Sequence, residues 1–297
     1  MNKKLLFVFN PFAGKGYIKN RIFGIVDVFV KNGCSVNIYP TQSKGDAAHV
    51  ISKHGAEFGT VVIAGGDGTL NEGIRGIMSI APEKRPYVGY IPAGTTNDFA
   101  ANFGISKNAV KAAEGIAKGN IFRCDVGSFG SESFIYVAAF GAFTDVAYGT
   151  PQEYKNILGQ TAYFWEGIKR LHSLKSYRMK VLHDGTECEG EFIFGMVSNT
   201  NHIGGFSTKR AFRAQLNDGL FEVVLVKRPK TLLELQDLIA HILTQDFKTD
   251  SFMVFSAERV SFEAEESVCW TLDGEFGGDL KKADISIEKQ AVGLFLG

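Results

Sequence analysis

The chain has 297 residues, 45% of them hydrophobic, so it is long enough to bury two modest cores or one large one. The chain has 32 basic residues (lysine plus arginine) and 32 acidic residues (aspartate plus glutamate). Its net charge is therefore zero, which excludes a long-range electrostatic attraction to nucleic acid. No apolar run approaches the roughly 20 residues of a membrane span, and the first residues lead into a short strand rather than a signal peptide. We therefore expect a cytoplasmic protein whose scattered cysteines are reduced.

The first 120 residues alternate between expected strands and expected helices. Apolar runs typical of buried strands occur at 5–9, 34–39, 61–64 and 87–91. Apolar residues at helical spacing indicate helices over 18–29, 47–51, 70–78 and 99–103. This alternation predicts a parallel sheet with helices on both faces. In such α/β folds, ligands bind beyond the carboxyl ends of the strands.

A polar or glycine-rich loop follows each of these expected strands. The loops are Asn10–Gly16, Thr41–Ser43, Gly65–Thr69 and Pro92–Asp98. If the sheet is parallel, all of them share one of its edges. The first loop lacks the glycine and hydroxyl pattern of a P-loop, so by itself it predicts a plain strand–helix connection. Lys15 becomes a candidate only through its neighbours.

The Gly65-Gly66-Asp67-Gly68-Thr69 turn is the strongest local signal. It joins an expected strand directly to an expected helix, which is where α/β proteins hold phosphate on glycine backbone and helix amides. Asp67 would repel phosphate, so we interpret it as a metal ligand or a proton acceptor. Thr69 with Glu72, and Thr95 with Asp98, have the spacing of capping boxes, and a capping role for Glu72 is about as well supported as a ligand role.

From about residue 121 short alternating strands dominate. They are expected at 134–139, 177–183, 191–197, 220–226, 260–264 and 268–272, with helices over 154–171 and 232–243. We predict a nucleotide-binding α/β domain over 1–122, to which 288–297 return, and a mainly antiparallel β-rich domain over 123–287. The active site is expected in the cleft between them.

The segment Trp270–Glu275 carries the second pair of candidate acids. On an extended strand Thr271, Asp273 and Glu275 would project together, and two neighbouring carboxylates favour proton uptake by one of them. The alternative is a simple hairpin turn at Asp273-Gly274. Asn217-Asp218-Gly219 is likewise a turn by default.

In combination these motifs resemble the catalytic domain of diacylglycerol kinases, and the whole chain is similar to the soluble bacterial lipid kinases of that family. The resemblance rests on Asn10-Pro11 with Gly14-Lys15, on Gly65–Thr69 with Asn71-Glu72, on Pro92–Ala100, on Asn217-Asp218-Gly219 and on Asp273-Gly274-Glu275. It implies an ATP- and Mg²⁺-dependent transfer of phosphate to a lipid hydroxyl, with diacylglycerol giving phosphatidic acid as the favoured reaction.

The resemblance also implies roles for individual residues. Glu275, Asp273 and Asp67 would be catalytic, with Glu275 favoured as the proton acceptor and the choice among them open. Asp67 would organise the catalytic Mg²⁺. Asp218 would hold a second Mg²⁺ with the carbonyl oxygens of Gln215 and Leu220. The candidate ATP-binding residues are Asn10, Lys15, Thr41, Gly65, Gly66, Asp67, Gly68, Thr69, Leu70, Asn71, Glu72, Thr95, Asn97 and Asp98.

Two other functions remain open at this stage. A NAD kinase shares the Gly-Gly-Asp-Gly-Thr turn but not the later Asp-Gly-Glu, and a catalytically silent nucleotide or lipid sensor would need no acids. A lipid substrate at a membrane surface, together with the 25 phenylalanines, indicates transient, peripheral membrane contact. The oligomeric state is open, a homodimer included.

Overall fold

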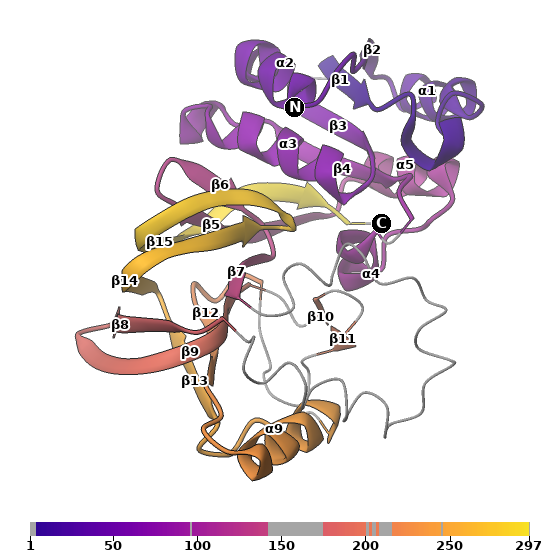
Figure 1. The fold of residues 1–297 in the computed structure, drawn as a ribbon. Helices are drawn as coiled ribbons and strands as arrows, with labels where there is room; N and C mark the ends of the chain where they lie inside the picture. Colours follow the sequence, from indigo (N-terminus) through magenta and orange to yellow (C-terminus); the bar gives the residue numbers. More distant parts are fainter. Residues whose placement is uncertain are drawn as a thin grey trace. The chain divides into compact units, whose positions relative to one another are not determined.

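The computed structural model describes residues 4–95, 97–141, 175–199, 202–203, 206–207, 216–244 and 246–296 (Figure 1). The chain forms two compact units. The first unit comprises Met1–Ile135, Leu216–Gly219 and Glu288–Gly297, and the second comprises Tyr136–Gln215 and Leu220–Ile287. The expected helix over 154–171 lies outside the described residues.

A sheet of parallel strands forms the centre of the first unit. The strands are β1 (Lys4–Phe9), β2 (Ser35–Pro40), β3 (Thr60–Gly65) and β4 (Tyr87–Pro92), in the order β2-β1-β3-β4. Nearly every residue of β1, β3 and β4 is buried, as expected of parallel strands covered on both faces. The last part of β15 (Glu275–Phe295) adds to this sheet, with Leu294 opposite Val88.

Helices pack on both faces of this sheet. They are α1 (Ile22–Lys31), α2 (Asp46–His54), α3 (Asp67–Met78), α4 (Asp98–Phe103) and α5 (Ala109–Lys118). A Cβ at Gly73 of α3 would lie 2.3 Å from Ile63, and a Cβ at Gly89 of β4 would lie 2.7 Å from Ile116 of α5. Ile63 pairs with Tyr90, the residue after Gly89, so α3 and α5 cover opposite faces.

The second unit is built from antiparallel strands. They are β7 (Val137–Gly141), β8 (Tyr177–His183), β9 (Thr186–Ser198), β12 (Phe221–Lys227), β13 (Phe252–Ala257), β14 (Arg259–Leu272) and the first part of β15; β10 (His202–Ile203) and β11 (Phe206–Ser207) form a separate pair. Strands β7 and β8 both lie between β9 and β14, at opposite ends of those longer strands. The two strands expected at 260–264 and 268–272 are one strand, β14, which is irregular between Glu263 and Val268.

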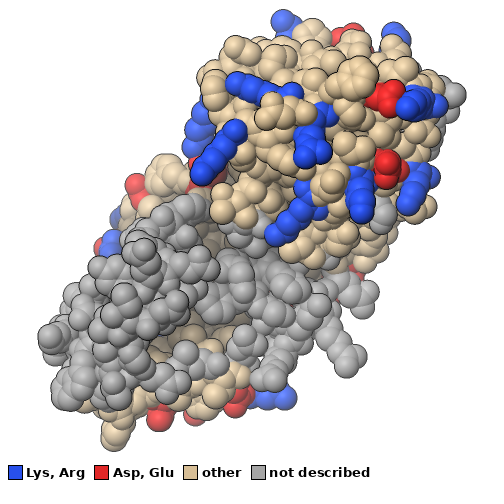
Figure 2. Space-filling view, turned by 90° about the vertical axis from the view of Figure 1, so that its right-hand side faces the viewer, with Lys and Arg blue, Asp and Glu red and all other residues tan. Residues whose placement is uncertain are grey.

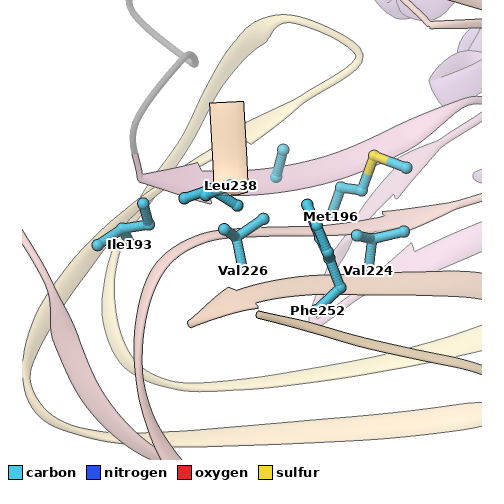
Figure 3. Packing of buried hydrophobic residues seen from close by; sticks show 7 residues of the cluster. Ile193, Met196, Val224, Val226, Leu238 and Phe252 are labelled. Carbon is cyan, nitrogen blue, oxygen red and sulfur yellow. The ribbon is translucent and has the colours of Figure 1, made fainter. Parts of the chain in front are cut away.

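Helix α9 (Leu232–Thr244) covers part of this sheet. The Thr231 hydroxyl accepts a hydrogen bond from the Glu234 amide, and the Glu234 carboxylate accepts one from the Lys230 amide. Leu238 packs into a buried cluster with side chains from the strands (Figure 3), whose members are Ala139, Ile193, Met196, Val224, Val226, Leu238 and Phe252. Across the described part of the chain, every helix is too short or too polar to span a bilayer.

The predicted boundary at residue 122 falls inside β5 (Ile121–Phe129) and differs from the division between the units. Strand β5 pairs with β6 (Glu132–Phe134), and both belong to the first unit. Asp125, in β5, is fully buried and binds to other segments of the first unit. Its carboxylate accepts hydrogen bonds from the amides of Gly219, at 2.7 Å, and Gln290, at 2.6 Å, and its own amide donates to the Leu216 carbonyl at 2.9 Å.

We expect Asp125→Ala to lower the free energy of unfolding of the first unit by about 2–4 kcal/mol. The substitution removes the acceptor of the buried Gly219 amide and of the Gln290 amide, and the loss of an acceptor costs about 1–3 kcal/mol for a buried amide. Urea unfolding gives the loss, and hydrogen exchange of β5 assigns it to this unit. Asp27→Ala is the control, because its solvent-exposed ion pair with Lys31 on α1 contributes only about 0.5 kcal/mol. Equal effects of the two substitutions would contradict the role of Asp125.

Candidate active site

The strands β2, β1, β3 and β4 end at the same level. Phe9 lies opposite both Pro40 and Ala64, and Ala64 lies opposite Ile91. Because the strands are parallel, the polar loops that follow them leave the sheet at one edge. The candidate ATP-binding residues of all these loops are therefore neighbours in the first unit.

The loop after β1 is held against its neighbours by backbone contacts. The Asn10 amide donates to the Ala64 carbonyl at 2.9 Å, and the Asn10 side chain accepts from the Phe12 amide at 2.9 Å. Gly14 and Lys15 both have left-handed backbones, with φ of 56°. A Cβ at Gly14 would lie 2.4 Å from the Ala93 carbonyl oxygen, so this loop touches the loop after β4. The Lys15 side chain is exposed.

The loop after β2 brings Thr41 and Glu72 to the same edge. The buried Thr41 donates its amide to the Phe9 carbonyl at 2.9 Å. The Glu72 carboxylate accepts from the Gly45 amide at 2.8 Å. The predicted capping box of Thr69 and Glu72 is wrong, because α3 begins at Asp67 with Gly66 as its N-cap and no side chain caps it. Glu72 instead ties α3 to the start of α2.

The turn between β3 and α3 is tightly packed at Gly65 and less so at Gly66. A Cβ at Gly65 would lie 2.5 Å from the Thr69 side chain, and a Cβ at Gly66 would lie 3.4 Å from Gly94. Asp67 is half-buried in the first turn of α3, with its carboxylate 3.5 Å from the Phe99 amide. Gly68 and Thr69 reach the surface of the turn.

Leu70 and Asn71 are buried on the inner side of α3. Their side chains are packed inside the first unit, and their contact with ATP stays a prediction.

The loop after β4 is organised by Asn97. Its side chain accepts from the Gly94 amide at 2.8 Å and donates to the Gly94 carbonyl at 2.7 Å. Its backbone is left-handed, with φ of 53°, a conformation that asparagine tolerates better than most residues. The predicted capping box of Thr95 and Asp98 is wrong, because α4 begins at Asp98 with Asn97 as its N-cap. Thr95 is exposed at the tip of this loop.

Tyr90, in β4, stabilises the loops after β3 and β4. Its hydroxyl donates to the Gly65 carbonyl at 3.1 Å, and its ring packs edge-on against Phe99. Burial, with a smaller contribution from the Asp67 charge, raises the pKa of Tyr90 far above its usual range. The phenol therefore stays protonated and keeps donating. Neither Tyr90 nor Asp125 was singled out from the sequence, because each stands inside an apolar strand pattern that predicts only core packing.

The second pair of candidate acids lies on the hairpin between β14 and β15 in the second unit. Leu272 pairs with Glu275, and Asp273 and Gly274 both have positive φ, as in a tight two-residue turn. The expectation that Thr271, Asp273 and Glu275 project together is wrong, because Asp273 is in the turn rather than on an extended strand. Trp270 and Leu272, which precede the turn on β14, are buried.

Asp273 is tied to the start of β7. One carboxylate oxygen accepts from the Tyr136 amide at 2.7 Å and the Val137 amide at 3.0 Å, and the Asp273 amide donates to the Val137 carbonyl at 2.8 Å. This carboxylate therefore has a structural task in fixing the hairpin. Glu275, half-buried at the first position of β15, is the other acid that the hairpin presents.

The predicted second metal site is only partly described. Asp218 is exposed in the turn 216–219, which Asp125 binds through Gly219, and Leu220 follows it. Gln215 lies outside the described residues. Among the residues that the structure describes, no cluster of three or more His, Cys, Asp or Glu side chains could hold a metal ion.

Two family descriptions match the chain. The first, Diacylglycerol kinase catalytic domain, matches residues 4–129. The second, YegS C-terminal NAD kinase beta sandwich-like domain, matches residues 141–295. The two matches together span nearly the whole chain.

Two curated relatives of this chain are both named diacylglycerol kinase. A diacylglycerol kinase of Bacillus subtilis (strain 168) is 33% identical over 281 residues, which cover 94% of this chain and 91% of the relative. A diacylglycerol kinase of Staphylococcus carnosus (strain TM300) is 32% identical over 287 residues, with the same coverage.

Solved structures show the same fold. A crystal structure of a diacylglycerol kinase from Bacillus anthracis str. Sterne has a TM-score of 0.75 at 21% identity and covers all of this chain and 97% of that one. Another structure from the same organism has a TM-score of 0.81 at 24% identity and covers all of this chain and 96% of that one.

We expect Asn97→Ala to destabilise the first unit more than Asn97→Gly. Both lose the two side-chain hydrogen bonds to Gly94, worth about 1 kcal/mol each, but alanine also carries about 1–2 kcal/mol of left-handed backbone strain that glycine avoids. Urea unfolding of the two variants measures the difference. Identical unfolding midpoints would show that the left-handed backbone is not the reason for an asparagine at position 97.

Proposed function

The chain belongs to the diacylglycerol kinase family, and on this premise we propose that it is a lipid kinase that transfers the γ-phosphate of ATP to a lipid hydroxyl. We propose diacylglycerol as the acceptor and phosphatidic acid as the product. The observation that supports this most directly is the common level at which β1 to β4 end, because it gathers the asparagine, threonine and glycine loops at one edge.

The edge of this sheet suits a triphosphate. At Gly66 and Gly68 no side chain restricts the approach of an anion, and the first amides of α3 point out of the helix start. We propose that these amides, with the side chains of Asn10, Thr41 and Thr95, bind ATP. Lys15, exposed on the loop after β1, would add a positive charge beside the phosphates.

The donor set at this edge fits Mg²⁺. The ion prefers oxygen ligands and is commonly held by one or two carboxylates plus substrate phosphates, so a single well-placed acid suffices. Asp67 supplies that carboxylate in the first turn of α3. A bound Mg²⁺ would neutralise charge on the transferring phosphoryl group. We further propose that Asp218 holds a second Mg²⁺ with the carbonyl oxygens of Gln215 and Leu220.

We propose Glu275 as the proton acceptor. The lipid hydroxyl loses its proton to the Glu275 carboxylate, its oxygen forms a bond to the γ-phosphorus, and the bond from that phosphorus to ADP breaks. Asp273 is less suited to this step, because one of its oxygens already accepts two backbone hydrogen bonds. Its role would be to fix the hairpin that carries Glu275.

This mechanism requires Asp67 and Glu275 to act on one phosphoryl group. We therefore propose that the active site is a cleft between the α/β domain and the β-rich domain. Residues 123–135 belong to the α/β part in this proposal, because β5 and β6 are anchored there.

We expect Glu275→Gln and Asp67→Asn each to reduce turnover about 10²-fold or more, because proton transfer and phosphate positioning contribute at least that much. ATP-dependent phosphorylation of diacylglycerol in mixed micelles measures it. If both acids serve one transfer, the double variant will lose much less than the product of the single losses.

Asp279→Asn is the matched control, since it removes an exposed carboxylate four residues further along β15. Near-normal turnover by either active-site variant would refute its role. Because the second matched family description names NAD kinase, the assay includes an arm with NAD as acceptor. Phosphorylation of NAD instead of lipid would overturn the proposal.

A lipid acceptor also requires contact with a membrane, and we propose that the first unit supplies it. Lys and Arg side chains outnumber Asp and Glu on the face of this unit seen in Figure 2. The first unit also has exposed phenylalanines: Phe12 is 75% and Phe23 83% exposed, and the Lys19 ammonium lies 4.8 Å from the Phe12 ring. Basic and aromatic side chains together favour the surface of an anionic bilayer.

We expect the double variant Lys19→Glu and Arg21→Glu to bind vesicles containing phosphatidylglycerol at least about tenfold more weakly, since each basic residue near an anionic surface contributes about 1 kcal/mol. Vesicle co-sedimentation measures the binding. Lys230→Glu with Lys248→Glu, exposed on the second unit, is the control with the same change in net charge. Equal loss in both double variants would exclude a specific basic face.

A further inference from the structure

Strand β2 (Ser35–Pro40) forms an open edge of the first unit's sheet. Among the described strands it pairs only with β1, and most of its residues are exposed, in contrast to β1, β3 and β4 (Figure 1). Exposed edge strands are normally protected by charged side chains, bulges or proline. Ser35 to Tyr39 contains none of these, and Pro40 occurs only at the end.

A groove of about 700 Å³ runs along this edge, between β2 and α2 (Asp46–His54). The buried apolar residues Leu6 and Val50 line its floor, and Val36 to Tyr39 of β2 line it as well. A groove with an apolar floor beside an unpaired strand edge has the features of a site for strand addition, in which an extended segment pairs with the edge and places alternate side chains in pockets.

The charged residues that line the groove indicate which kind of partner segment would bind there. His49 and Lys53 stand one turn apart on α2 and both line it. Within the described ranges neither side chain takes part in an ion pair or a side-chain hydrogen bond. The acid on this rim, Glu57, lies 3.1 Å from the ring of His54. Lys53 therefore offers a positive charge without an ion-pair partner among the described residues, which complements a carboxylate.

We propose that the β2 edge and this groove bind an extended, acidic segment of a partner protein by strand addition. The backbone of the segment would continue the sheet beyond β2. Successive residues of a strand point to opposite faces, so the side chains at every second position would enter the groove. There an apolar side chain would cover Leu6 and Val50, and a carboxylate would reach Lys53 and His49. This inference goes beyond the lipid kinase activity and does not depend on it.

The test uses the full chain and a capped six-residue peptide, Ser-Val-Ser-Glu-Ser-Val (the valine–glutamate peptide), whose valine and glutamate side chains all project from one face of an extended strand. We expect the peptide to slow hydrogen exchange of the backbone amides within Ser35–Tyr39 in a saturable way, while the amides of Tyr87–Ile91 in β4, inside the same sheet, are unaffected. The same peptide with lysine in place of glutamate (the valine–lysine peptide) is the matched probe of charge and should give no protection at the same concentration.

A charge-reversal pair of variants completes the test. Lys53→Glu should weaken binding of the valine–glutamate peptide at least about tenfold, because an attraction becomes a repulsion at the rim. Lys118→Glu, in the last turn of α5, makes the same charge change away from the groove and should leave the affinity unchanged. Hydrogen exchange of α2 in both variants verifies that the fold is intact.

Three outcomes would overturn the proposal. The first is the absence of protection of β2 at millimolar peptide. The second is equal binding of the valine–lysine peptide. The third is protection of β2 that grows with protein concentration in the absence of peptide, together with the mass of a dimer, because a second copy would then occupy the edge. None of these readouts involves phosphoryl transfer, so each outcome is separate from the fate of the proposed function.

Discussion

The register of the parallel strands in the first unit is the constraint on which the candidate site depends. Phe9 stands opposite Pro40 and Ala64, and Ala64 stands opposite Ile91, so the loops that follow these strands begin at one level. A slip of one residue would turn the buried side chains of a strand to the other face, and the apolar patterns of β1, β3 and β4 oppose such a slip. The loops then lock one another, through Gly14 against Ala93 and Gly66 against Gly94.

Carboxylates in this protein divide between structural and chemical tasks. Asp125 binds two amides from distant segments and so joins β5, the turn 216–219 and the end of β15 in one unit. Asp273 binds two amides of the 136–137 segment and sets the hairpin in which Glu275 stands. In both cases backbone amides find an acceptor that an apolar side chain could not supply. Asp67 and Glu275 are the acids that the proposed chemistry needs, and each is presented by backbone that other residues hold in place.

Much of the fold was predictable because local patterns agreed with the global structure. The period of the apolar residues identified β1 to β4, and the helix expected over 232–243 is α9. Capping predictions failed at α3 and α4, where glycine and a left-handed asparagine start the helices. There, contacts between loops take precedence over local capping preference: Glu72 binds Gly45, and Asn97 binds Gly94. The helix over 154–171 and Gln215 remain predictions.

The sequence by itself determined the order of strands and helices, the glycine turn around Asp67 and the resemblance to a lipid kinase family. These features are local: they follow from side-chain periodicity and from backbone conformations that few residue types adopt. Only the tertiary structure decided what Asp125, Tyr90 and Asp273 bind, and that β2 is the strand with an open edge. Hydrogen bonds between residues from 25 to 165 positions apart leave no periodic trace in the sequence, because their geometry exists only once the sheets have formed.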